Sequence, residues 1–221
     1  MLNFTRLAAA AAIVSALFVA PALASDQTEL IDRANRTVNH LRTDPAFSQA
    51  ARMIHSARAV LIVPRLVKGG FIFGAEGGDG VLLKRSGRTW SQPAFFSLAS
   101  ASFGLQIGLQ QAELVFIIMS DRALSGIVHG ETKLGAGAGL TVVTLSSGAE
   151  GATTTHGGDI IVWSSGTGAY GGLTFNGSVV KPRNDWNADF YGKDVGIMGV
   201  LNNKVKSPDT ATLRRNLATV W

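Results

Sequence analysis

Glycine is confined to one part of this chain. All 26 glycines in the 221 residues lie at or after Gly69, and none precedes it. Glycine weakens helices and serves turns and close backbone approaches, so a helical segment is predicted at 25–58. The glycine-rich remainder is predicted to form mostly short strands and turns. No proline-rich or serine-rich linker separates the two parts, so we expect a single domain over residues 25–221.

The composition indicates a folded domain that is not held together by disulfides. Apolar residues make up 46% of the chain and charged residues 16%, which is too apolar and too weakly charged for a disordered protein. The absence of cysteine excludes thiolate metal sites and thiol nucleophiles, and four histidines leave little for a histidine metal centre. We therefore expect neither a cofactor nor a metal ion.

Residues 1–24 have the pattern of a secretory signal peptide. Arg6 gives a short positive start, an apolar run follows from Leu7 to Ala20, and Ala22-Leu23-Ala24 fits the small-residue rule for cleavage before Ser25. The apolar run is shorter than the roughly 20 residues that a spanning helix needs, and a retained membrane anchor is the alternative. We expect an exported protein, located in a bacterial periplasm or peripheral to the outer membrane.

Two helices are predicted ahead of the strands. Apolar residues recur at helical spacing between Leu30 and Leu41 and fall within one arc of the helix surface, which predicts a first amphipathic helix from about Thr28 to Leu41. Asp44-Pro45 combines a capping residue with proline at the first helical position, which predicts the start of a second helix.

Short apolar runs bounded by turn residues predict the strands. These runs lie at 59–63 (ended by Pro64), 71–73, 81–83, 114–119, 140–145, 159–163 and 173–180. A short helix is predicted from Asp121 to Ile127, and a closing helix in the tail after Ser207. The pattern predicts an α+β fold, in which N-terminal helices pack on a curved, mainly antiparallel, glycine-rich sheet or on a barrel-like sandwich.

Two glycine-rich stretches could be mistaken for phosphate-binding loops. Gly166–Gly171 spells G-x-G-x-x-G, but strand and turn residues follow it instead of the helix that a dinucleotide fingerprint requires. Gly74–Gly80 lacks the Gly-Lys-Ser/Thr ending of a phosphate loop, and its two acidic residues do not have the spacing of a calcium-binding EF-hand. We interpret both stretches as turns.

Motifs for catalysis are also weak. His129 and His156 lie near Glu131 and Asp159, but no His-Glu-x-x-His pattern and no Gly-x-Ser-x-Gly elbow occurs. We therefore expect a non-enzymatic protein. The enzyme alternative requires a pocket in which one of these histidines meets a carboxylate and a nucleophile.

A basic window near the predicted helices has the most functional promise. No acidic residue occurs between Asp44 and Glu76, although four basic residues singled out below lie there. Cations beside an amphipathic helix attract anionic lipid headgroups, at about 1 kcal/mol per basic residue near the surface. Nucleic acid is not expected as a partner, because the basic residues lack interleaved aromatic residues.

The residues predicted to contact lipid form two groups. The predicted headgroup residues are Arg33, Arg36, Arg52, Arg58, Arg65 and Lys68. The residues predicted to insert into the bilayer or to line an apolar groove are Leu30, Ile31, Val38 and Leu41. The alternative is that the first helix packs on the sheet and that its cations form a solvated face.

Several sequence blocks keep a fixed order along most of the chain. They are Ala57–Pro64, Lys68–Gly74, Gly80–Leu83, Trp90–Phe96, Gly104–Gly108, Leu134–Gly139, Gly171–Phe175 and Tyr191-Gly192. Taken together over about residues 30–200, they resemble the SYLF domain, a lipid-binding family. Its eukaryotic members include actin-regulating adaptor proteins, and many of its bacterial members are secreted.

The resemblance implies a non-enzymatic domain that binds membrane phospholipid with the help of an amphipathic N-terminal segment, which this chain has at 28–41. Bacteria generally lack the phosphoinositides that eukaryotic members recognise, so the expected ligand is an anionic phospholipid such as phosphatidylglycerol or cardiolipin. Actin is not expected to be a partner of an exported protein. The alternative function is an envelope protein-interaction or scaffold module without lipid specificity.

Overall fold

A computed structural model describes residues 25–44, 53–70, 73–103, 110–130, 133–134, 142–146, 158–165, 178–192 and 194–219. Its strands are β1 (Ala59–Gly70), β2 (Phe73–Ser86), β3 (Thr89–Trp90), β4 (Ala94–Phe103), β5 (Gln110–Ile118), β6 (Lys133–Leu134), β7 (Val142–Ser146), β8 (Ile160–Ser164) and β9 (Ser178–Pro182). Its helices are α1 (Asp26–Thr43), α3 (Asp121–His129), α4 (Asn184–Tyr191), α5 (Gly196–Leu201) and α6 (Ala211–Ala218), with a 3₁₀ turn, η2 (Pro208–Thr210), before α6.

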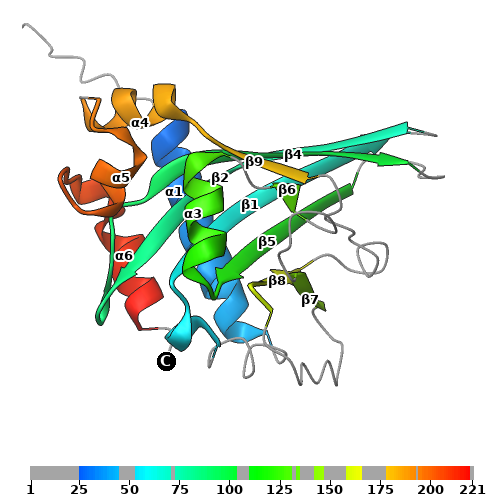
Figure 1. Cartoon of the computed structure of the whole chain (residues 1–221), viewed down its shortest axis with the longest axis horizontal. Coiled ribbons are helices and arrows are strands. Elements are labelled where there is room, and N and C mark those ends of the chain that lie inside the picture. Colours follow the sequence, from blue (N-terminus) through cyan, green and yellow to red (C-terminus); the bar gives the residue numbers. More distant parts are fainter. Residues whose placement is uncertain are drawn as a thin grey trace, which may run out of the picture.

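The strands form an open sheet in the order β6-β9-β4-β2-β1-β5-β8-β7, and β3 pairs with the end of β2 (Figure 1). Every neighbouring pair is antiparallel except β7 and β8, which run parallel. The predicted α+β fold with a mainly antiparallel sheet is therefore confirmed, and the sheet is open in the part of the chain that the structure describes.

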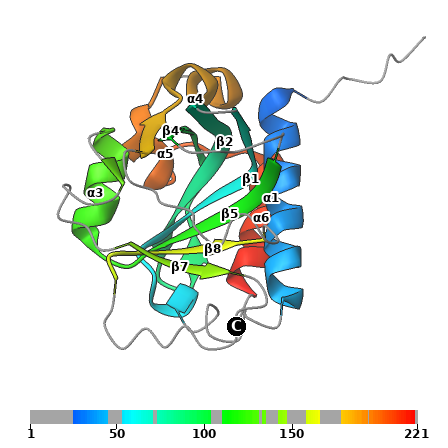
Figure 2. The same cartoon turned by 90° about the vertical axis from the view of Figure 1, so that its right-hand side faces the viewer.

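Helices cover both faces of the sheet. Figure 2 shows α3 on one side of the strands, with α1 and α6 on the other. Successive side chains of a strand point to opposite faces, so in β1 Leu61 and Val63 join the cluster beneath α3 and α5, whereas Val60 and Ile62 join the cluster beneath α1 and α6. Burial on both faces explains why the central strands are continuously apolar instead of alternating with polar residues.

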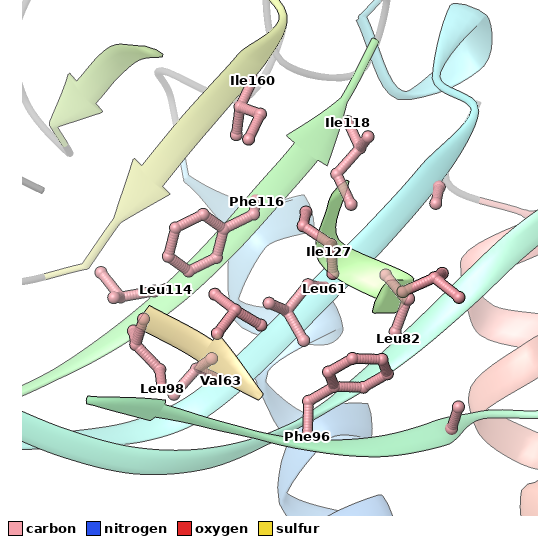
Figure 3. Close-up of a cluster of buried hydrophobic side chains, with 14 of the residues drawn as sticks. Leu61, Val63, Leu82, Phe96, Leu98, Leu114, Phe116, Ile118, Ile127 and Ile160 are labelled. Atoms are coloured by element: carbon pink, nitrogen blue, oxygen red, sulfur yellow. The ribbon is translucent and has the colours of Figure 1, made fainter. Parts of the chain in front are cut away.

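Figure 3 shows the first of these clusters, in which side chains from several strands meet α3. Phe116 of β5 and Phe96 of β4 lie with Leu61 in this layer, and all three are almost completely buried. Ile127 enters the cluster from α3, whose amino end is capped by the Ser120 hydroxyl accepting a hydrogen bond from the Ala123 N–H. The predicted short helix is confirmed, and Asp121 lies in its first turn.

The first helix is confirmed and extends slightly beyond its predicted bounds. The closing helix is also confirmed as α6, and Pro208 lies in the 3₁₀ turn before it. For the second predicted helix, residues 53–56 are helical and residues 45–52 lie outside the described residues. Asp44 belongs to the end of α1, and its buried carboxylate accepts a hydrogen bond of 3.0 Å from the Trp163 indole N–H.

The apolar stripe of α1 is buried against the sheet and α6. Leu30, Ile31, Val38 and Leu41 all lie in the core, and the most accessible of them is only 8% exposed. Burying side chains of this size contributes about 1.5–3 kcal/mol each. These residues, predicted to insert into a bilayer or to line a groove, therefore pack in the core of a docked helix, which is the alternative given above, and Leu30 also lines the groove described below.

Polar contacts fix how α1 sits on the sheet. The Thr37 hydroxyl donates a hydrogen bond of 2.8 Å to the Glu113 carboxylate of β5, and the His40 ring nitrogen Nδ1 lies 2.5 Å from the other oxygen of that carboxylate. On the opposite flank, the Asn216 side chain of α6 donates to Asn35 of α1 at 2.7 Å. The helix is therefore held on both flanks as well as along its buried stripe.

Strand β1 continues past Pro64, where the sequence predicts its end. The pairing register of β1 shifts between Val63 and Leu66 against β5, and between Ile62 and Val67 against β2. Proline has no N–H to donate and is tolerated at a strand irregularity, so β1 resumes its pairing beyond it. Such an irregularity redirects side chains, and here it includes Arg65, whose side chain is exposed.

Glycines of β2 allow this irregular part of β1 to lie close. A Cβ atom placed on Gly78 would be 2.4 Å from the Arg65 carbonyl oxygen, and one on Gly80 would be 2.7 Å from the Ile62 carbonyl oxygen. The interpretation of Gly74–Gly80 as a turn is therefore wrong, because these residues lie within β2. Their missing side chains make room for the neighbouring backbone.

Ile31→Ala tests the docking of α1. The substitution removes a buried side chain from the helix–sheet core and is expected to lower the free energy of unfolding by about 2–5 kcal/mol. Asp32→Ala changes the neighbouring exposed residue and is expected to stay within about 0.5 kcal/mol. Urea unfolding of both variants measures the difference, and equal stability would contradict the docked position of the helix.

Gly78→Ala tests the close approach of β1 and β2. Its methyl group would overlap the Arg65 carbonyl, so we expect a loss of about 1–3 kcal/mol in the free energy of unfolding. Gly77→Ala is the matched control, because its Cβ would meet only the Leu98 carbonyl oxygen at an ordinary 3.8 Å. A thermal unfolding series in which both variants are equally stable would show that Gly78 makes no such approach.

Candidate functional site

A groove lies where the amino-terminal half of α1 meets β1, β2 and α4. It has a volume of about 510 Å³, within the range of small-ligand sites. Its lining consists of Asp26, Glu29, Leu30, Arg33, Pro64, Arg65, Val67, Gly77, Gly78, Asp79 and Trp186. In Figures 1 and 2 the amino-terminal end of α1 lies toward α4. We call this feature the α1–β1 groove.

Helix α1 and strand β1 form two walls of the groove. The α1 wall spans Asp26 to Arg33, about 10 Å at 1.5 Å per residue. The β1 wall is the irregularity at Pro64 and Arg65, held against β2 at Gly78. The site therefore depends on the docking of α1 and on the close approach of the two strands.

Two ion pairs lie at the groove. The Arg33 guanidinium contacts the Glu29 carboxylate at 2.5 Å, one turn away on α1. Arg183, the residue directly before α4, contacts the Asp79 carboxylate of β2 at 3.0 Å and lies 4.1 Å from the centre of the Trp186 ring. These contacts tie α4 to β2 and orient the Trp186 side chain at the groove.

Arg183 also contacts an acid outside the groove. Its hydrogen bond to the exposed Asp185 carboxylate lowers the pKa of that carboxyl below its ordinary value. The same bond, together with the nearby charges of Asp185 and Asp79, raises the pKa of the Arg183 guanidinium above its ordinary value. Arg183 therefore stays charged, but its guanidinium is already paired with the carboxylates of Asp79 and Asp185.

Two charged groups of the groove have no ion pair or hydrogen bond from their side chains within the described residues. Asp26 lies in the first turn of α1, and Arg65 lies on the β1 irregularity. Both side chains are exposed. The negative charge of Asp26 is stabilised by the positive end of the helix dipole. Arg65 lies in a strand, where no helix dipole stabilises its positive charge.

The structure brings together part of the predicted headgroup set. Arg33 and Arg65 line the same groove, and exposed Arg36 is a neighbour of Arg33 on the surface of α1. Arg58 lies apart, about 23 Å from Arg65 along β1 at 3.3 Å per residue, and its guanidinium is 3.5 Å from the Asp121 carboxylate. Arg52 and the side chain of Lys68 lie outside the described residues.

Sequence reasoning missed the groove's contributions from distant segments. Asp26 was not singled out, Asp79 was assigned to a turn, and Trp186 carried no motif. The lining joins α1 to residues of β2 and α4 that lie far along the chain, and no local spacing reports such a meeting. The one available signal was Arg65 itself, a cation that follows the apolar run 59–63 and Pro64 directly.

The histidines do not assemble a catalytic site among the described residues. His129 is exposed at the end of α3, and its ring contacts Ser125 of the same helix, with the Nδ1 atom 2.7 Å from the Ser125 carbonyl oxygen. Asp159 contacts Ser120 and Arg122. His156 and Glu131 lie outside the described residues.

Metal-ligand clusters and membrane-spanning helices are both absent from the described part of the chain. No group of three or more histidine, cysteine or acidic residues is arranged there to hold a metal ion. No helix in those same segments combines the length and apolar character needed to cross a bilayer.

Comparisons with known proteins connect the chain to one family. The model of the Ysc84 family, described as a Las17-binding protein actin regulator, matches residues 99–220. The protein YSC84 of Saccharomyces cerevisiae is 29% identical over 156 residues, which cover 68% of this chain and 33% of the yeast protein. No solved structure was found to match.

Animal relatives give the same result. The SH3 domain-containing YSC84-like protein 1 of Rattus norvegicus is 28% identical over 165 residues, covering 73% of this chain and 48% of the rat protein. The Xenopus laevis protein of the same name is 30% identical over 137 residues, covering 61% and 41%. The matched region thus spans between a third and a half of these relatives. The family model covers more than half of this chain. The chain therefore belongs to the Ysc84 family, also called the SYLF domain family, which is linked to lipid binding and actin regulation.

Proposed function

We propose that this protein binds anionic phospholipid membranes at the bacterial cell envelope without catalysing a reaction, and that Arg33, Arg36 and Arg65 contact the headgroups. The observation that carries the proposal is the α1–β1 groove, which brings Arg65 of β1 together with Arg33 of α1, and Arg36 lies one turn from Arg33 on the surface of that helix. Arg36 and Arg65 are exposed and have no acidic partner in the described residues, so both guanidiniums are available to phosphate oxygens.

The charge of the chain supports this proposal. The formal net charge is +5, and removal of residues 1–24 would take away only Arg6 and leave +4. A net positive protein is attracted to an anionic surface before any specific contact forms. The signal-like pattern at 1–24 supports export, which would bring the domain to the envelope.

The docked position of α1 determines the mode of binding that we propose. The apolar stripe of α1 is committed to the core, so contact with the membrane is made by exposed cations on the flank of the helix and on β1. Attraction of this kind is screened by salt, over about 10 Å at 0.1 M ionic strength. We therefore propose a peripheral and reversible association.

A protein-interaction module is the second candidate. The description of the family model as a Las17-binding actin regulator favours it, although for an envelope protein the partner would be another envelope protein. Among the described residues, Met198 is the one large hydrophobic side chain that is exposed, at 45%. Docking of a partner through exposed phenylalanine or tryptophan side chains therefore finds little support in that part of the chain.

Flotation with liposomes tests the proposed lipid binding. The purified protein is expected to float with vesicles that contain phosphatidylglycerol and to float much less with phosphatidylcholine vesicles. Arg36→Ala and Arg65→Ala should each weaken the anionic binding about fivefold, since one basic residue near the surface contributes about 1 kcal/mol. Raising the salt concentration should weaken binding further.

Arg88→Ala is the matched control for flotation, because Arg88 is exposed in the turn between β2 and β3, away from the groove. If this variant loses as much binding as Arg65→Ala, the effect reflects net charge alone and the proposed surface is wrong. If the protein floats with neither kind of vesicle but captures an envelope protein in a pull-down, the second candidate replaces lipid binding.

A further inference from the structure

The charges of the α1–β1 groove are mixed in sign. Three carboxylates and two guanidiniums line it, and the Glu29–Arg33 and Asp79–Arg183 contacts pair two of these carboxylates. Asp26 and Arg65 are the members of the lining left without a partner in the described residues. One is negative and comes from α1, and the other is positive and comes from β1.

This arrangement discriminates between classes of ligand. A ligand with several negative groups would find Arg65 but would also meet the carboxylates of Asp26, Glu29 and Asp79. A purely cationic ligand would find Asp26 but would meet the guanidiniums. A ligand that carries one anionic and one cationic group can satisfy both unpaired side chains, and it leaves the existing ion pairs intact.

We infer that the α1–β1 groove binds a phosphodiester that bears a primary amine, such as the phosphoethanolamine headgroup of a phospholipid, with its phosphate on Arg65 and its ammonium on Asp26. This inference rests on the proposed function, since it names the headgroup that is recognised once the protein is at a membrane. Anionic lipid attracts the protein to the surface, and the groove selects the amine-bearing headgroup there.

The chemistry of each group fits its role. The planar guanidinium of Arg65 presents paired donors that match phosphate oxygens, and the Asp26 carboxylate accepts hydrogen bonds from an ammonium group. The apolar parts of Leu30, Val67 and Trp186 in the lining suit the carbon chain between the two charges. The Gly78 approach fixes the backbone at Arg65 and the docked helix fixes the backbone at Asp26, so the two side chains start from defined positions on the walls of the groove.

The inference is tested with soluble headgroups and the full chain. Titration of the protein with glycerophosphoethanolamine, followed by NMR or calorimetry, is expected to show saturable binding, and glycerol 3-phosphate should bind more weakly. Asp26→Asn should weaken glycerophosphoethanolamine binding about fivefold and should not weaken glycerol 3-phosphate binding. Arg65→Ala should weaken both. Asp32→Asn, which removes an exposed carboxylate elsewhere on α1, should change neither.

Vesicles distinguish failure of this inference from failure of lipid binding. Asp26→Asn removes a negative charge, so it should leave flotation on phosphatidylglycerol vesicles unchanged or stronger while it removes any gain from added phosphatidylethanolamine. If wild-type protein binds glycerophosphoethanolamine no better than glycerol 3-phosphate, or if Asp26→Asn binds it equally well, the amine is not recognised and the inference is overturned. If the wild-type protein does not float with anionic vesicles, the proposed function is overturned instead. Circular dichroism confirms that each variant is folded.

Discussion

The burial of α1 against the sheet is the interaction on which the rest of the structure depends. Its apolar stripe closes one of the two cores, and the contacts of Thr37 and His40 with Glu113 fix its position beside β5. Once the helix is docked there, its amino-terminal half becomes a wall of the α1–β1 groove. The same docking buries the apolar stripe of the helix in the core and leaves its charged flank exposed.

Glycine has a different role in this fold from the one that its abundance first indicates. The glycine-rich stretch before Val81 is part of a long strand, and Gly78 and Gly80 leave space for the carbonyl groups of β1. The irregularity at Pro64 and the two glycines opposite it form one unit, in which the proline interrupts regular pairing and the glycines admit the displaced backbone. The exposed position of Arg65 follows from this unit.

The fold class could be predicted from the sequence because its signals are local. The apolar stripe between Leu30 and Leu41 and the apolar runs of the central strands each reflect burial of a single element. Strand β4 had no predicted counterpart, since its Ser97–Ser102 part consists of serine and alanine apart from Leu98, and these small residues have a weak strand preference. The length of β1 was underestimated because proline usually ends a strand.

The candidate site could be predicted only in part. The sequence shows which basic residues lie near α1 along the chain, but the sheet determines how they are grouped. Arg65 lies in the same groove as Arg33, whereas Arg58 lies at the start of β1 beside Asp121. The acidic residues of the groove could not be grouped from the sequence, because Asp26 and Asp79 line the same groove only after α1 packs on β1 and β2. Sequence patterns therefore indicated a basic surface where the structure has a groove of mixed charge.

Hydrogen–deuterium exchange on the vesicle-bound protein tests most directly whether α1 stays docked while the domain binds lipid. We predict that the backbone amides around Ile31 to Val38 remain as protected on phosphatidylglycerol vesicles as they are in solution, while the protein is demonstrably bound. Protection that collapses throughout α1 upon vesicle binding would mean that the helix leaves the sheet and inserts its apolar stripe, and it would contradict the central claim.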